Sequence, residues 1–489
     1  MNTGDLFYRT GQPHTRGGCQ NRRQFLQRAG AGFGAVALAA LLDQIGLLKS
    51  SAAITAAPGN PLQARPPHFA PRAKSVIWCF MNGGPSGIDL FDPKPELDRC
   101  DGLKMENKGP ITTFSKKIGP LMKSPFRFEK YGECGHPVSE VYSHIGKHVD
   151  DIAFIKACHH ESNVHDQALF QTNTGMTRLG HPSAGSWVTY GLGSENQNLP
   201  GFIVMHDPRG MPVSGPPLWS SGFLPNAFQG TIFHEGANPI MDLRRPAEMS
   251  EHAQRRQLDF IAEMDAQHQA EHPAEADLLG RISSFELAYR MQMAAPEAVD
   301  LARESEATKQ LYGMDRPESR AYGSQLLMAR RLVERGARFI QAYSGGAPED
   351  WDAHESLALN HRKRCLETDI PIAGLLSDLK QRGLLDTTLV IWGGEFGRLP
   401  ITETKGGRDH NPHGFLLWMA GGGIKGGISV GETDEVGYRA ADDPVSINDV
   451  HATILALLGL DHTKLTYLHN GREFRLTDVS GEVIRRMIA

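Results

Sequence analysis

The chain has 489 residues, a formal net charge of -5 and a calculated isoelectric point of 6.5. Hydrophobic residues make up 40% of it and charged residues 22%, as in a globular protein with enough chain to bury a large core. Because there is no basic surplus, a nucleic-acid partner is not expected. The six cysteines match neither a zinc ribbon nor a disulfide scaffold, although Cys100 and Cys134 are a candidate disulfide in an oxidising compartment.

The amino terminus carries the features of an export signal. The twin-arginine pattern NRRQFL begins at Asn21, and a stretch rich in glycine and alanine continues to Leu48. Asp43 interrupts that stretch, which argues against a transmembrane anchor, and small residues offer a cleavage site near Ala53. We therefore predict that residues 1–53 are a twin-arginine signal segment. The protein would be periplasmic or extracellular, with membrane contact only through this segment if it stays uncleaved.

Beyond a proline-rich linker at residues 54–72, the pattern predicts an α/β fold over residues 73–489. Helical spacing of apolar residues from Leu366 to Leu379 indicates an amphipathic helix, and a charged helical insertion is predicted at about 246–336. The alternation of strands and helices predicts a doubly wound, mostly parallel sheet with helices on both faces. Short apolar runs predict its strands at 75–80, 152–157, 201–205, 338–344, 388–392 and 415–420.

Acidic and imidazole side chains follow several of these strands. Asp89 follows the first strand, Asp352 and His354 follow the strand at 338–344, and Glu395 follows the strand at 388–392. In a doubly wound sheet these three loops open on the same edge, where ligands bind. The segment GRDHNPHG supplies His410 and His413 just before another strand, so its placement is less constrained.

This mixture of ligands predicts a site for a divalent metal. Carboxylates with imidazoles favour zinc or manganese, whereas a set dominated by carboxylates would favour calcium or magnesium, so the metal stays open. For Asp89 alone, a helix cap or Asx turn is the competing interpretation. The candidate ligands are Asp89, Asp352, His354, Glu395, His410 and His413.

Two resemblances accompany this pattern. The run LETDIPIAGLLSDLKQRGLLDTTLVIWGGEFG resembles a segment of sulfatases and the alkaline phosphatase superfamily, whose strand ends in a metal-binding Asp followed by His or Asn. Here Glu395 and Phe396 stand at those two positions. The motifs MNGGPSGIDLFDPKP, GGEFGR and GRDHNPHGF, with the Trp-Asp-x-His at 351–354, resemble the exported domain of unknown function 1501 family, over nearly the whole mature chain. That resemblance implies an alkaline phosphatase-like fold.

The departures from sulfatases concern the nucleophile. No C/S-x-P-x-R signature occurs, so a formylglycine sulfatase is not expected. The corresponding helix is ESNVHDQALFQTNTG, in which His165 lies near the nucleophile position and Ser162 lies one turn earlier. Ser162 would serve as a nucleophile if a metal lowered its pKa, and its competing role is to cap the helix.

The expected function is therefore an exported, metal-dependent hydrolase of sulfate or phosphate esters, with an anionic ester or sulfated glycan as substrate. His165 or Ser162 would act on the substrate, and Arg398 and Arg408 would pair with its anionic oxygens. The alternative is a non-catalytic protein of the same fold that binds a glycan or a partner, which the missing signature supports. A metal-dependent phosphomutase is a third, less favoured reading, because export removes the protein from most phosphorylated sugars.

Overall fold

The computed structural model describes residues 60–105, 113–114, 119–234, 239–241, 243, 245–271, 276–346 and 350–489. The chain divides into the units Met1–Thr55 and Ala56–Ala489, and every described residue belongs to the second. The predicted signal segment, residues 1–53, and the first part of the predicted linker thus lie outside the described residues. Within the described ranges, no helix combines the length and the apolar character that spanning a bilayer requires.

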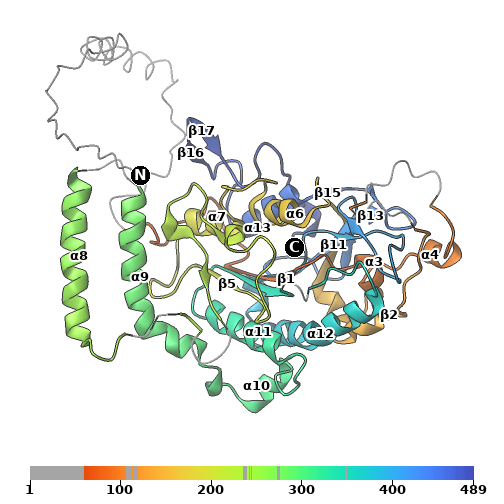
Figure 1. Ribbon diagram of the computed structural model, residues 1–489, viewed down its shortest axis with the longest axis horizontal. Helices are drawn as coiled ribbons and strands as arrows, with labels where there is room; N and C mark the ends of the chain where they lie inside the picture. Colours follow the sequence, from red (N-terminus) through yellow and green to blue (C-terminus); the bar gives the residue numbers. More distant parts are fainter. Residues whose placement is uncertain are drawn as a thin grey trace, which may run out of the picture. The chain divides into compact units, whose positions relative to one another are not determined.

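A mixed, mostly parallel sheet of nine strands forms the centre of this unit (Figure 1). The strand order is β12-β4-β11-β8-β1-β7-β5-β6, and β15 also pairs with β4. Only β11 runs antiparallel, to both β8 and β4, so the predicted fold class is confirmed. The bounds are β1 Ser75–Met81, β4 Ile152–His159, β5 Phe202–Met205, β6 Thr231–Ile232, β7 Phe339–Ser344, β8 Thr388–Gly393, β11 Phe415–Ala420, β12 Ile428–Val430 and β15 Val445–Ser446.

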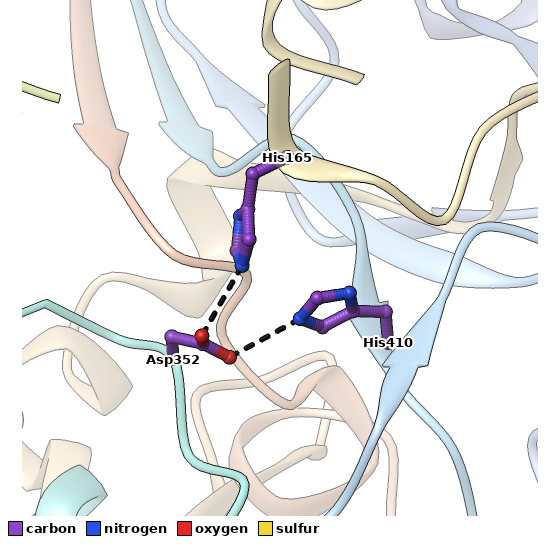
Figure 2. Close-up of side chains that lie close together, drawn as sticks. All are labelled: His165, Asp352 and His410. Atoms are coloured by element: carbon purple, nitrogen blue, oxygen red, sulfur yellow. Dashed lines mark hydrogen bonds and ion pairs between the residues drawn. The ribbon is translucent and has the colours of Figure 1, made fainter. Parts of the chain in front are cut away.

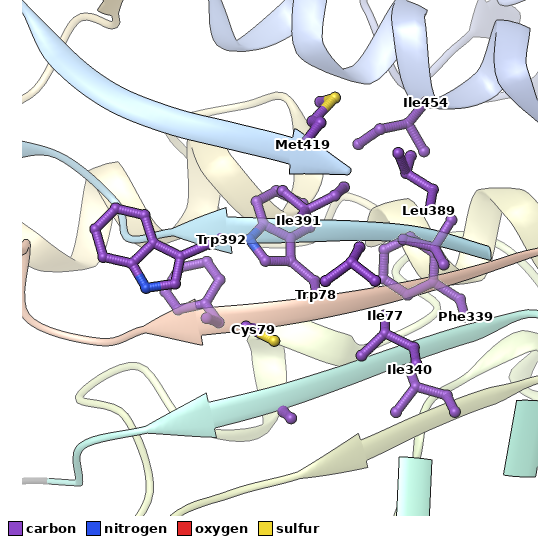
Figure 3. Close-up of a cluster of buried hydrophobic side chains, with 14 of the residues drawn as sticks. Ile77, Trp78, Cys79, Phe339, Ile340, Leu389, Ile391, Trp392, Met419 and Ile454 are labelled. Atoms are coloured by element: carbon purple, nitrogen blue, oxygen red, sulfur yellow. The ribbon is translucent and has the colours of Figure 1, made fainter. Parts of the chain in front are cut away.

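The three central strands are buried along their whole length, as their unbroken apolar sequences predict. In-register parallel pairing sets Ile77 beside Ile340 on one side and Val390 on the other. Figure 3 shows side chains of these strands packed together, with Ile454 of a covering helix above them. Each fully buried aliphatic side chain contributes about 1.5–3 kcal/mol, so this sheet is a rigid base for the loops at its edge.

Helices cover both faces of the sheet, with α6, α7 and α13 on one side and α11 and α12 on the other (Figure 1). The residues predicted as a helical insertion hold α8 to α11. Of these, α8 and α9 pack on each other, and α11 packs on α12 and β7; the insertion as a unit stays a prediction. The bounds are α6 His165–Thr174, α7 Ala184–Leu192, α8 Glu251–Glu271, α9 Ala276–Val299, α10 Glu306–Leu311, α11 Arg320–Val333, α12 Leu357–Gln381 and α13 Ile447–Leu457.

The candidate disulfide is not formed, because Cys100 and Cys134 are both free. Cys100 follows the short helix α4 (Pro95–Arg99), and its thiol lies 3.1 Å from Glu96 Oε1. Cys134 follows the strand β2 (Phe128–Tyr131) in an exposed turn. Cys79 in β1 and Cys158 in β4 are buried.

Two buried histidines predict a loss of stability in mild acid. His361 Nε2 accepts a hydrogen bond from the Ser86 amide at 2.9 Å, and His451 Nε2 donates to Thr172 O at 2.8 Å. Burial lowers the pKa of His361 to about 3 and that of His451 to about 4. The unfolded chain, with histidine pKa values of about 6.5, binds these protons first. The protein therefore loses none of its stability to these two histidines above pH ~6.5, and its unfolding free energy declines as the pH falls below that value.

At pH 5 each of these histidines costs about 2 kcal/mol relative to neutral pH. Urea unfolding at pH 7.5 and pH 5 measures the loss. In the His361→Gln variant, where an amide oxygen takes the Ser86 hydrogen bond, the loss is expected to shrink by about 2 kcal/mol. An unchanged difference between the two pH values would contradict the assignment of His361 as a neutral, buried base.

Candidate metal centre

The segments that the sequence singled out meet at one edge of the sheet. Strands β1, β7 and β8 end there, and helix α6 begins there at His165, after β4. His410 lies in β10 (His410–Asn411), which pairs with β9 (Gly397–Arg398). Because β11 runs antiparallel to β8, it starts at the edge where β8 ends. The segment that leads into β11, which contains His410, therefore lies at this same edge. The antiparallel strand thus resolves the one placement that the sequence left unconstrained.

Three imidazole rings direct their Nε2 atoms at the carboxylate of Asp352. His165 Nε2 lies 3.3 Å from Oδ2, while His354 Nε2 and His410 Nε2 lie 3.1 and 3.2 Å from Oδ1. Figure 2 shows His165 and His410 reaching Asp352 from different elements. Side chains more than 180 residues apart in sequence are thus gathered around one carboxylate, as the sequence predicted for Asp352, His354 and His410.

The opposite nitrogen of each ring is bonded to an oxygen. The Nδ1 atom of His165 lies 2.7 Å from Glu395 Oε1, and that of His354 lies 2.5 Å from Glu403 Oε2. The Nδ1 atom of His410 donates to the Asn163 carbonyl at 2.7 Å. Because carbonyl and carboxylate oxygens only accept, each Nδ1 carries a proton. In the neutral rings the three Nε2 atoms then carry lone pairs, the arrangement of metal-binding histidines.

The residues fit a cation at this point. His165 Nε2 is buried and makes no hydrogen bond to the described residues. His354 Nε2 and His410 Nε2 are 2.9 Å apart, and two lone pairs cannot face each other at that distance without a proton or a metal ion. Ligand atoms of His165, Asp352 and His410 all lie within 4.8 Å of one another, as do those of His354, Asp409 and His410. His410 belongs to both groups and has a single open nitrogen, so it could serve only one ion.

The charges of the cluster are strongly coupled. Burial opposes the ionised form of Asp352, but Arg398 and the three histidines hold the pKa of its carboxyl well below its usual range. Burial also opposes a charge on His165, yet Asp352 and Glu395 raise its pKa to about 9. The pKa of His354 is raised in the same way by Asp352, whereas burial lowers that of His410 to about 4. A metal ion entering the cluster would therefore displace protons from His165 and His354.

Two tight contacts hold the cluster in place. Both carboxylate oxygens of Glu395 accept from the Gly83 amide, at 2.9 and 3.1 Å. Gly83 has φ +109°, and a Cβ there would lie 2.6 Å from the Asp352 amide nitrogen, so only glycine fits. The ring of Phe396 stacks on His410 with centroids 4.4 Å apart. Phe396 thus packs against one of the candidate ligands.

Glu395 lies behind the cluster. The sequence proposed it as a metal ligand, whereas its side chain is fully buried and contacts the outer nitrogen of His165. A carboxylate in that place orients the imidazole and raises its basicity. Ser162 is also engaged within its own loop, donating to Gln167 Oε1 at 2.9 Å and accepting from the Val164 amide at 3.1 Å.

Of the other predicted residues, Arg398 contacts the cluster through Asp352, and the rest make their contacts outside it. Asp89 accepts two hydrogen bonds from Arg408, at 2.8 and 3.1 Å, and both side chains are fully buried. Arg398 is buried too, and it bonds the carbonyls of Gly83, Gly84 and Arg408 as well as Asp352 Oδ1 at 2.6 Å. The ring of His413 packs edge-on against Tyr438. The two arginines are therefore used within the protein, where sequence reasoning had assigned them to the substrate.

Sequence reasoning missed two residues that orient the histidines, Glu403 and Asn163. Asn163 acts through its backbone carbonyl, which no sequence pattern signals. Glu403 lies in the loop between β9 and β10, seven residues before His410, and its side chain is 7% exposed. An acidic residue so close to the HNPH motif was the available signal for it.

The Glu403→Gln variant is expected to bind metal about 10–100-fold more weakly, because it loses the carboxylate that orients His354. Competition with a coloured chelator measures that affinity. Glu355→Gln is the matched control, since Glu355 is exposed and pairs with Lys405 on the surface. Equal affinity of the Glu403→Gln variant and the wild type would remove Glu403 from the site.

A search of curated proteins found no match for this chain. Among solved structures it is similar to the PsFucS1 sulfatase from Pseudoalteromonas sp., with 12% identity over 83% of this chain and 74% of that one, and a TM-score of 0.34. It is also similar to the alkaline phosphatase from the Antarctic bacterium TAB5, with 10% identity over 80% and 99% and a TM-score of 0.35. A third is Ps i-CgsB in complex with k-i-k-neocarrahexaose, with 12% identity over 79% and 72% and a TM-score of 0.33.

The family match covers far more of the chain than any motif. The model described as "Protein of unknown function (DUF1501)" matches residues 73–488, which is nearly all of the described part. The chain therefore belongs to the DUF1501 family.

Proposed function

We propose that this protein is a metal-dependent hydrolase of sulfate or phosphate esters, exported by the twin-arginine route. The observation that carries the proposal is the convergence of three Nε2 atoms on Asp352, with each Nδ1 bonded to an oxygen. A set of three imidazoles and one carboxylate favours zinc or manganese over calcium or magnesium, which prefer oxygen ligands. Export rests on the NRRQFL pattern at Asn21.

A bound divalent ion would supply Lewis-acid stabilisation of charge that develops on the ester oxygens. The chain's own residues prepare the site for it. Glu395, Glu403 and the Asn163 carbonyl hold the three rings in one orientation. Arg398 fixes Asp352 from behind, with its guanidinium fully buried. Because these groups are already in position, little reorganisation opposes the reaction.

The site lies where an ester can reach it. The carboxyl ends of parallel strands are the usual ligand-binding edge of α/β sheets, and His165, His354 and Asp352 are all partly exposed there. Sulfate and phosphate esters would place negative oxygens at the metal, which suits the positive charge of the ion.

One observation favours the alternative, a non-catalytic glycan- or partner-binding protein. Ser162 is hydrogen-bonded within its loop, and the buried arginines are paired with Asp352 and Asp89. If the protein is a hydrolase, Ser162 is not its nucleophile, and a water molecule activated by the metal would take that role.

Turnover of aryl sulfates and aryl phosphates by the metal-loaded protein tests the proposal. We expect activity on at least one ester class, abolished in His354→Ala and strongly reduced in Glu395→Gln. The His413→Ala variant is the matched control, because its ring packs outside the cluster. Stoichiometric metal without turnover on any ester would reject the hydrolase and favour the binding protein.

A further inference from the structure

Besides the metal cluster, a cavity opens at the same edge of the sheet. It measures about 420 Å³, within the roughly 300–1,000 Å³ range of small-molecule sites. Asp207 and Arg209 reach it from the loop after β5, Ser344 from the end of β7, Gln325 from α11, and Leu366 and Glu367 from α12. All of these residues are described, and none belongs to the metal cluster.

A chain of contacts through Gly345 connects the lining of this cavity to Asp352. The Gly345 amide donates to Asp207 Oδ2 at 2.9 Å. A Cβ on Gly345 would lie 2.9 Å from Asp350 Cα, and Asp350 Oδ1 in turn accepts from the Asp352 amide at 2.9 Å. Both sites therefore use the carboxyl end of β7. The cavity lies on the side of β5, and the centre lies on the side of β1.

Among the residues that line the cavity, the acidic Asp207, Glu318 and Glu367 outnumber the basic Arg209 and Lys363. Arg209 Nη2 lies 2.6 Å from Asp207 Oδ2, and Arg209 Nη1 lies 2.9 Å from Glu367 Oε1. A guanidinium held by two carboxylates offers no uncompensated positive charge to an anion. The carboxylates, however, keep lone pairs that can accept further hydrogen bonds. A bare sulfate or phosphate is therefore a poor match for this cavity, and a donor of hydroxyl protons is a good one.

The remaining lining has a polar and an apolar part. Gln325 is 2% exposed, and its Nε2 donates to the His206 carbonyl at 2.8 Å, while its Oε1 has no partner among the described residues. Leu366 is 60% exposed at the cavity, beside Pro208 and Pro317. Hydrogen-bond acceptors next to apolar surface suit a ligand with several hydroxyls and exposed C–H groups, as in a sugar ring.

We infer that this cavity binds an uncharged sugar unit of the substrate, while the sulfate or phosphate ester lies at the metal centre. The inference rests on the proposed function and narrows its substrate to an ester of a glycan. Leu366 and Gln325 are then specificity-determining residues, since neither lies among the groups that surround Asp352.

Binding of methyl glycosides of glucose, galactose, fucose and N-acetylglucosamine, observed by saturation-transfer NMR on the full chain, tests the inference. We expect at least one of them to bind, and Leu366→Glu to weaken that binding about tenfold. Ala321→Trp, which fills the cavity from α11, is expected to abolish it. Leu359→Glu is the matched control, because Leu359 is a 73% exposed leucine of the same helix that does not line this cavity.

The outcome is independent of metal and of turnover. Sugar binding that persists in His165→Ala but disappears in Ala321→Trp supports the inference. Failure of all four glycosides to bind, binding of inorganic sulfate in the cavity, or equal effects of Leu366→Glu and Leu359→Glu would each overturn it. None of these results tests the metal centre. If the proposed metal centre is wrong, the protein would bind the sugar but no metal ion.

Discussion

The Arg408→Ala variant is expected to lose about 3–5 kcal/mol of unfolding free energy. Arg408 and Asp89 are both fully buried and joined by two hydrogen bonds across 319 residues of sequence. Removal of the guanidinium would leave the Asp89 carboxylate charged and without an ionic partner among the described residues, with Ser86 as a remaining side-chain contact. The cost of burying an unpaired charge far exceeds the net value of the pair. Urea denaturation followed by circular dichroism measures the change.

Two further variants test whether the unpaired Asp89 charge causes this loss of stability. Lys405→Ala, in the same loop, breaks an exposed ion pair with Glu355 and is expected to change stability by less than about 1 kcal/mol. The double variant Asp89→Leu/Arg408→Met removes both charges, so it is expected to recover part of the loss. Stability of Arg408→Ala within about 1 kcal/mol of the wild type would show that Asp89 has another partner, which a metal ion could provide.

The Asp352→Asn variant is expected to lose both metal and turnover. Asp352 is the carboxylate on which His165, His354 and His410 converge, and asparagine keeps the shape without the charge. Metal stabilisation of a transition state is worth several kcal/mol, and a loss of about 4 kcal/mol lowers the rate roughly 10³-fold. Metal content and hydrolysis of an aryl ester measure the two effects on the same preparation.

Asp166→Asn is the control for this variant. Asp166 follows His165 in α6, but its carboxylate accepts from Ser214 at the surface. We expect this variant to keep its metal and its rate. An Asp352→Asn protein with wild-type metal content would place the ion elsewhere in the chain.

The sheet could be predicted from sequence because its strands are unbroken apolar runs. Val76–Phe80 and Leu389–Trp392 pack on both faces, so hydrophobicity alone identifies them. The shared edge of parallel strands then predicts that Asp352, His354 and Glu395 lie together, whereas the placement of His410 depended on the direction of β11. The helix predicted from Leu366 differs in detail from the observed helix α12. It begins earlier, at Leu357, and Leu366 itself is exposed at a cavity, because helical spacing does not say which neighbours exist.

The roles within the site depend on partners that lie far away in the sequence. Asp89 was assigned to the metal and Arg408 to the substrate, whereas the fold joins them to each other. Glu395 was assigned as a ligand, but its bonds to His165 Nδ1 and to the Gly83 amide place it behind the candidate ligands. Local patterns identify residue types suited to a metal site, and only tertiary contacts separate the ligands from the groups that orient them.

Metal analysis of the purified full chain tests the central claim most directly. After loading with zinc or manganese and removal of the excess, mass spectrometry of the metal is expected to find about one ion per chain. The ion should be lost in His165→Ala and retained in His413→Ala, whose ring packs against Tyr438 outside the cluster. A chain that retains no stoichiometric ion, or an equal ion content in the wild type and His165→Ala, would contradict a metal centre built on Asp352.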